Sequence, residues 1–276
     1  MGDELRGILS KLYTGSLWGL LICHTPNAMA GAWTLEPKAR QVISTSIIDR
    51  ADRVLGPDID TSGDPNFSKL ESGLYIEQGL TQRVTLVGQS AYQTVSFNNG
   101  VEQVTFSGFS NSSIGLRYGV IQSDRDAFSV EFHGIINGGG EDVPDGDLGR
   151  GGSSIELRGL YGRNVSVLGK NGFAEIQLAG RRRLNDDPFE IRSDGTLGVQ
   201  VSDKLLVLAQ GFYMQNNGTL SDPMDPVFAT HSLKGQASFV YWVKPRLGLQ
   251  VGAIRTIIGR NVVDEEALLL GLWRKF

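Results

Sequence analysis

The clearest structural signal in the chain lies at residues 113–133, which read SIGLRYGVIQSDRDAFSVEFH. Apolar and polar side chains alternate with a period of two on both sides of a short polar connection near Arg125. Leu116 and Tyr118 share the apolar face before this connection, and Val130 continues it afterwards. Because successive side chains of a β-strand point to opposite faces, the pattern predicts an antiparallel hairpin with one apolar and one polar face.

The same alternation recurs along the chain after Gly31, and no segment there shows a convincing helical period. Glycine supplies 36 of the 276 residues, well above the usual share of about 7%. We therefore predict an all-β fold of about twelve antiparallel strands. The predicted strands cover residues 40–50, 68–79, 83–96, 110–121, 127–137, 153–163, 172–181, 194–202, 204–214, 232–243, 247–257 and 266–276.

The connections between these strands alternate strictly in length. The short ones fall near Thr81, Arg125, Ser166, Asp203 and Pro245. The long ones, rich in glycine and aspartate, fall at about 51–67, 97–109, 138–152, 182–193, 215–231 and 258–265. In a soluble β-sandwich, long loops are not expected to gather at one end. Transmembrane β-barrels, in contrast, have short periplasmic turns, long external loops and an even number of strands. Residues 31–276 are therefore expected to form an antiparallel transmembrane β-barrel in the bacterial outer membrane.

Composition excludes two other classes of protein. The formal net charge is −4 and there is no basic cluster, which argues against a nucleic-acid partner. The chain has no run of 18 apolar residues, so it is not a polytopic helical membrane protein.

Residues 1–30 have the layout of a cleaved signal peptide. Arg6 and Lys11 precede the apolar stretch LWGLLIC at residues 17–23, and Ala28 and Ala30 offer a small-residue cleavage site. Cleavage after Ala30 would also remove the one cysteine of the chain, which suits an oxidising compartment. A second interpretation, an N-terminal helix packed on the domain, stays open.

Two short stretches resemble known outer-membrane proteins. The last seven residues, LGLWRKF ending at Phe276, resemble the C-terminal signal of bacterial outer-membrane barrels, although Arg274 departs from the usual aromatic or apolar residue. Residues 31–37, GAWTLEP, followed by QVI at 41–43, resemble the start of outer-membrane transporters associated with aromatic-compound degradation. These resemblances imply an outer-membrane location, recognition of Phe276 by the barrel-assembly machinery, contact with membrane lipid and lipopolysaccharide, and a channel-like role.

The polar faces of four consecutive predicted strands carry charges of alternating sign, at Arg117, Glu131, Arg158 and Glu175. The midpoints of the three hairpins fall inside the predicted connections, so the four side chains are expected at one height of the lumen. Two interpretations remain open: a constriction that selects solutes by charge and size, or a salt-bridge girdle that fills the barrel. Further lumen-facing residues are predicted at Glu71, Glu77, His133, Gln177 and Gln200.

Arg181, Arg182 and Arg183 end the seventh predicted strand at the outer mouth. They either attract an anionic solute or lipopolysaccharide phosphates, or form a solvated loop base.

No catalytic residue, metal site or cofactor is expected. His133 and His231 lack the serine two residues later that outer-membrane lipid hydrolases use, and no Gly-x-Ser-x-Gly motif occurs. The sequence favours a non-enzymatic channel for passive passage of a small solute. The alternative is a closed structural or surface-interaction barrel that serves envelope integrity or adhesion without transport.

Overall fold

The computed structural model describes residues 31–55, 66–98, 103–136, 153–184, 189–216, 231–260 and 262–276 of the chain. The predicted signal peptide lies outside the described residues. In the part that is described, fifteen strands and no helix occur: β1 Arg40–Ala51, β2 Val54–Leu55, β3 Phe67–Gly79, β4 Val84–Asn98, β5 Gln103–Phe109, β6 Ser112–Gln122, β7 Asp126–Ile136, β8 Ser153–Val167, β9 Lys170–Arg183, β10 Glu190–Ser202, β11 Leu205–Asn216, β12 His231–Lys244, β13 Leu247–Arg260, β14 Val262–Val263 and β15 Glu266–Lys275. The described segments thus contain no helix long and apolar enough to cross a membrane.

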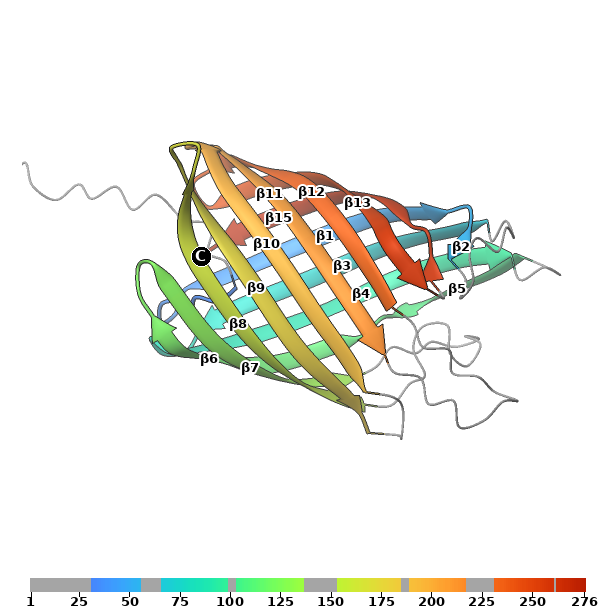
Figure 1. Cartoon of the computed structure of the whole chain (residues 1–276), viewed down its shortest axis with the longest axis horizontal. Helices are drawn as coiled ribbons and strands as arrows, with labels where there is room; N and C mark the ends of the chain where they lie inside the picture. The colour runs from blue at the N-terminus through green and yellow to red at the C-terminus, as the bar shows by residue number, and fades with distance from the viewer. Residues whose placement is uncertain are drawn as a thin grey trace, which may run out of the picture.

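The strands form an antiparallel barrel (Figure 1). The pairing of β3 with β4 joins the two ends of the sheet, and β1 pairs with β15, so the first and last long strands are neighbours. β5 and β6 lie end to end along β4, separated only by Ser110 and Asn111. The barrel wall therefore has twelve strand positions, which confirms the predicted fold class and strand number. The short β2–β14 ribbon is a separate sheet.

The predicted long connection at 97–109 is wrong in the structure, because β4 and β5 form a paired hairpin there. Cross-strand pairs hold it, such as Thr94 with Ser107, whose hydroxyls are 2.8 Å apart, and Phe97 with Phe106, whose rings meet edge to face. The predicted loops 182–193 and 258–265 are also shorter than expected, since β9, β10 and β13 extend into them. Arg182 and Arg260, both exposed, interrupt the apolar alternation at these strand ends, although both are still paired across the sheet.

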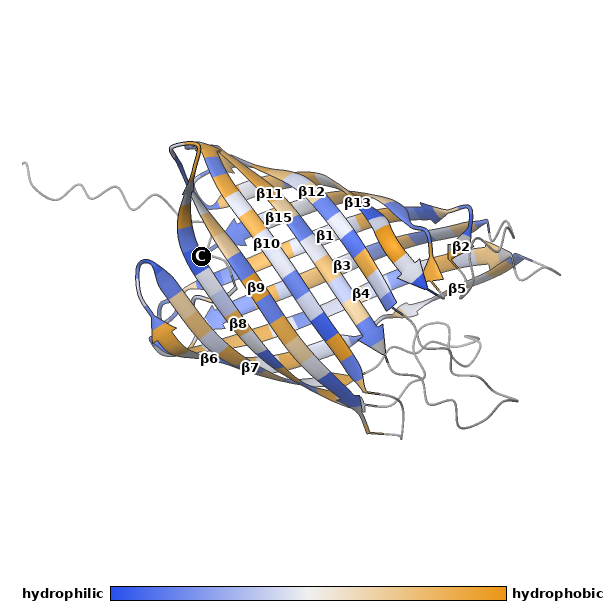
Figure 2. Ribbon diagram, in the orientation of Figure 1, coloured by the Kyte–Doolittle hydropathy of each residue, from blue (hydrophilic) through white to orange (hydrophobic). Residues whose placement is uncertain are grey.

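The two faces of the barrel wall differ sharply in polarity. Outward positions carry exposed large apolar side chains; Leu116, Phe132 and Leu178 are 51%, 54% and 62% exposed. Inward positions of the same strands are buried and many are charged, Arg117 and Glu131 among them. Figure 2 shows the resulting alternation along the strands. This is the pattern of a barrel surrounded by hydrocarbon with a polar interior.

An apolar cluster occupies the inside of the barrel near the short turns, on β9 to β12. It consists of Phe173, Leu206, Leu208, Val240 and Trp242, with Trp33 and Trp273 packed against it. These positions lie within a few residues of the β8–β9, β10–β11 and β12–β13 turns or near the C-terminus. The cluster therefore narrows the end of the barrel that carries the short connections.

Candidate functional site: the barrel lumen

Inward-facing side chains surround a cavity of about 780 Å³ inside the barrel. Polar and charged groups form much of its wall, and four of the five additional residues that were predicted to face the lumen line it: Glu71, Glu77, His133 and Gln177. The fifth, Gln200, does not line this cavity. Its amide donates to the carbonyl oxygen of Ser202 beside the β10–β11 turn, at 2.7 Å.

Three of the four predicted constriction residues share one row of the wall. Arg117 is directly opposite Glu131 across β6–β7, and Glu131 is directly opposite Arg158 across β7–β8. The predicted registers of both hairpins are confirmed. Glu175, however, is opposite Gly162, whereas Arg158 is opposite Ala179. The four charges therefore do not lie in a single row.

The β8–β9 turn explains the shift of Glu175. Leu168 and Gly169 both have positive φ angles, 50° and 75°, and form a two-residue turn. Hairpins favour this left-handed type I′ geometry because it matches the twist of the strands. The turn is two residues beyond the predicted midpoint near Ser166, and this moves the facing residues by four positions.

Arg117 is the centre of the first polar network. Its guanidinium donates to Glu131 Oε2 at 2.6 Å and to Glu77 Oε1 at 2.7 Å, and also contacts the Tyr75 hydroxyl at 3.2 Å. His133 Nε2 lies 2.7 Å from the other Glu131 oxygen. Arg117 is only 1% exposed. A cation so deeply buried needs such partners, because burial of an unpaired charge costs several kcal/mol.

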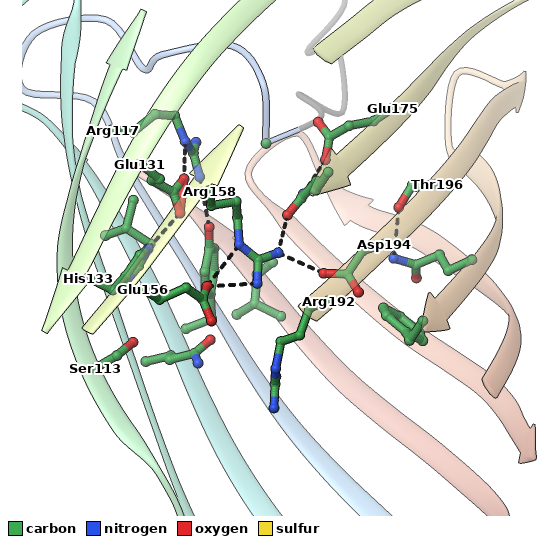
Figure 3. Close-up of a pocket in the computed structure, with 18 of the residues that line it drawn as sticks. Ser113, Arg117, Glu131, His133, Glu156, Arg158, Glu175, Arg192, Asp194 and Thr196 are labelled. Atoms are coloured by element: carbon green, nitrogen blue, oxygen red, sulfur yellow. Dashed lines mark hydrogen bonds and ion pairs between the residues drawn. The ribbon is translucent and has the colours of Figure 1, made fainter. Parts of the chain in front are cut away.

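Arg158 is the centre of a second network that faces the cavity more openly (Figure 3). It pairs with Asp194 at 2.7 Å and with Glu156 at 2.9 Å, and also donates to the Gln177 side chain. The Asp194 side chain is 23% exposed, in contrast to the enclosed Glu131. This network therefore presents charge to whatever occupies the cavity.

The three arginines predicted at the outer mouth do not form one patch. Arg181 points inward and pairs with Glu156 at 2.9 Å, whereas Arg182 is exposed. The side chain of Arg183 lies outside the described part of the structure. Because neighbouring residues of a strand point to opposite faces, a run of three cannot share one side of the wall.

Sequence reasoning missed several charged residues of the cavity wall, namely Glu156, Asp194, Arg192 and Lys234. Glu156 had a usable signal, since it is two residues from Arg158 and so shares its face. Arg192 was assigned to a loop, although β10 begins at Glu190. Its guanidinium pairs with Glu190, contacts Met214 Sδ at 3.9 Å, and extends away from Asp194 (Figure 3).

Residues 31–36, here called the lumen segment, lie inside the barrel before β1 begins. Ala32 is fully buried, and its carbonyl accepts bonds from Ser129 Oγ at 2.6 Å and from the Gln122 amide at 3.2 Å. Leu35 donates its backbone N–H to Thr85 Oγ1 at 2.9 Å. Inward side chains of the wall thus take the place of a neighbouring strand for this segment.

Two wall glycines make room for the lumen segment. A methyl group on Gly162 would lie 2.4 Å from the Trp33 ring, and one on Gly79 would lie 2.0 Å from the Glu36 carbonyl oxygen. Both positions require glycine because the segment approaches the wall so closely. Together with the apolar cluster, the segment fills much of the lumen near the short turns.

No protein-family model matches the chain, and no curated protein matches its sequence. Solved structures do share its fold. An outer membrane channel from Pseudomonas putida F1 superposes with a TM-score of 0.69 at 13% identity, covering 90% of this chain and 99% of that chain. The NanC porin gives 0.58 at 9% identity, covering 85% and 100%. The translocator domain of the autotransporter NalP from Neisseria meningitidis gives 0.51 at 10% identity, covering 99% and 95%. The chain has the fold of the outer-membrane β-barrels.

Proposed function

We propose that the protein is an outer-membrane channel through which a small polar solute passes without energy coupling. The observation that carries this proposal is the charge-lined cavity of about 780 Å³ inside a barrel whose outer face is apolar. A polar interior with many charged groups is typical of barrels that hold water in the lumen. Two of the similar folds belong to a channel and a porin, which agrees with this role.

The apolar outer face of the barrel also supports a location in the outer membrane. Outward apolar side chains suit lipid and lipopolysaccharide acyl chains, and strands of 10 to 15 residues, such as β15 and β4, are long enough to cross the membrane when tilted. Residues 1–30 would direct the chain into the envelope, and Phe276 would present the C-terminal signal to the barrel-assembly machinery. The protein acts without a cofactor or a catalytic step.

The Arg158 network, rather than the Arg117 network, is expected to contact the solute. Arg117 and Glu131 are enclosed and paired with each other, so they support the wall. Asp194 and Arg192 have side chains that are 23% and 30% exposed at the cavity. Charged groups at such positions set the ion preference of a channel.

A closed barrel without transport is the second candidate. The observation that favours it is the filling of the lumen near the short turns by the lumen segment and the apolar cluster. In this case the barrel would serve envelope integrity or surface contact through its external loops.

Conductance of single molecules in planar bilayers separates these two functions. Refolded residues 31–276 should give stepwise currents, and Asp194→Asn should shift the reversal potential in a salt gradient toward anion preference. Arg192→Gln should shift it in the opposite direction. Glu266→Gln is the matched control, since this carboxylate is 67% exposed and pairs with Arg255 at 3.2 Å. If a barrel whose folding has been verified gives no current, the closed barrel is supported instead.

A further inference from the structure

Glu175 is a buried carboxylate that lacks a cation. It is 8% exposed and accepts hydrogen bonds from the Ala32 backbone N–H, at 2.6 Å, and from the Gln177 amide. Among the described residues, no lysine, arginine or histidine lies within ion-pair distance of it. A buried carboxylate normally has such a partner, because solvation is lost on burial and must be replaced.

The nearest cation is already engaged. Arg117 already forms ion pairs with Glu77, at 2.7 Å, and with Glu131, at 2.6 Å. Its single positive charge is therefore shared by two carboxylates other than Glu175. Three carboxylates, Glu77, Glu131 and Glu175, thus surround the Arg117 guanidinium, and the second guanidinium, that of Arg158, is linked to Glu175 only through the Gln177 side chain. One further positive charge at Glu175 would reduce this imbalance.

The start of the lumen segment lies at the Glu175 carboxylate. Glu175 Oε2 accepts the N–H of Ala32, and a methyl group placed on Gly31 would lie 3.4 Å from Glu175 Oε1 and 3.6 Å from Arg117 Nη2, so the carboxylate is the nearer charged group. The two carboxylate oxygens thus face two successive residues of the segment. Gly31 is also the first residue after the predicted cleavage site at Ala30.

We propose that cleavage between Ala30 and Gly31 creates the missing cation, and that the α-ammonium of Gly31 forms an ion pair with Glu175 that fixes the lumen segment in place. Hydrolysis adds one water across the peptide bond, leaving a carboxylate on Ala30 and an ammonium on Gly31. An α-amine has an ordinary pKa of about 7.7–8.0, so this group is mostly charged at neutral pH. The uncleaved chain has a neutral amide at the same place. Removal of the signal peptide would therefore supply the cation that Glu175 lacks, as well as release the protein.

Reactivity of the α-amine tests the ion pair. The processed protein is isolated from outer membranes, its first residue is determined by N-terminal sequencing, and acetylation by acetic anhydride is followed by mass spectrometry at neutral pH. We expect the chain to begin at Gly31, with an α-amine that reacts at least about tenfold more slowly in the folded barrel than in urea, equivalent to about 1.4 kcal/mol. Glu175→Gln should remove most of this protection, while Glu266→Gln, on the outside of the barrel, should retain it.

A second pair of chains keeps the test decisive if Glu175→Gln does not fold. Refolded residues 31–276 and 30–276 both contain Glu175, but the longer chain carries its ammonium one residue further away and should be acetylated quickly. The ion pair is disproved by rapid acetylation of the folded wild type, by equal protection in Glu175→Gln, by equal protection of the 30–276 chain, or by a processed chain that begins elsewhere. None of these measurements depends on conductance, so the outcome is independent of the channel function.

Discussion

Replacing Arg117 with methionine tests whether the first lumen network holds the barrel wall together. The substitution keeps much of the side-chain volume but leaves Glu77 and Glu131 facing each other without the cation that separates them. Removing one partner of a buried ion pair typically costs about 3–5 kcal/mol. The two hydrogen bonds that Arg117 donates to Glu131 and Glu77 give a similar cost, because hydrogen bonds to charged groups contribute about 1.5–3 kcal/mol each.

The free energy of unfolding is measured by denaturant titration of the refolded barrel in lipid vesicles, with fluorescence from Trp33, Trp242 and Trp273. Arg163→Met is the matched control. Arg163 also pairs with a carboxylate, Asp126 at 3.3 Å, but its side chain is 43% exposed, so its loss should cost less than about 1 kcal/mol.

A double-mutant cycle isolates the pair itself. Glu131→Gln in the Arg117→Met background removes one of the two stranded carboxylates, so the double variant should be more stable than the sum of the single losses predicts, by about 0.5–3 kcal/mol. If Arg117→Met costs no more than Arg163→Met, or if the two changes simply add, the network does not stabilise the wall and the reasoning fails.

Two other substitutions and one deletion address separate features. Gly162→Ala places a methyl group 2.4 Å from the Trp33 ring and should dislodge the lumen segment and raise single-channel conductance, whereas Gly134→Ala, which meets nothing within 4 Å, should not. Leu168→Asn should stabilise the barrel by up to about 1 kcal/mol in denaturant titration, because asparagine tolerates the φ of 50° at this fully exposed turn position; a loss of stability would contradict this. Deletion of Phe276 should lower the amount of assembled barrel in cells, while the refolded protein should lose no more than about 0.5–1.5 kcal/mol, the contribution of one backbone hydrogen bond; unchanged assembly would argue against its role as a signal.

The barrel itself was accessible from the sequence because lipid and lumen impose opposite polarity on alternate residues. The alternation around Leu116 and Phe132 correctly predicted where these strands lie and which of their faces meets the lipid. The short β6–β7 connection correctly predicted that Arg117 is opposite Glu131. In β5 the alternation continues with the opposite phase, because Gln103 and Thr105 are exposed whereas Phe106 is buried, so the pattern no longer marks a lipid-facing strand. Prediction therefore failed mainly at the outer ends of strands.

The details of the site depended on information that alternation does not contain. Glu175 was misplaced because a left-handed conformation at Leu168, unusual for this residue type, moved the turn. The lumen segment was not anticipated at all, since residues 31–36 have no period and their partners, such as Ser129 and Thr85, are distant in the sequence. The sequence shows a glycine at position 162, but only the structure shows that Trp33 lies too close to this position for any larger residue.

The pairing of β1 with β15 sets an order of events for folding. The other pairings between long strands of the wall join strands that are close in sequence, including β1 with β3 and β13 with β15. The β1–β15 pairing instead joins the beginning of the barrel to its end, and the Phe276 backbone N–H donates to the Arg40 carbonyl at 2.9 Å. Such a contact has the largest loop-closure entropy of the whole fold and forms only when synthesis is complete. Until then the growing chain has two open sheet edges and must be shielded from aggregation on its way to the membrane. The same proximity of the two ends makes the protein a natural candidate for circular permutation, with new termini in an external loop.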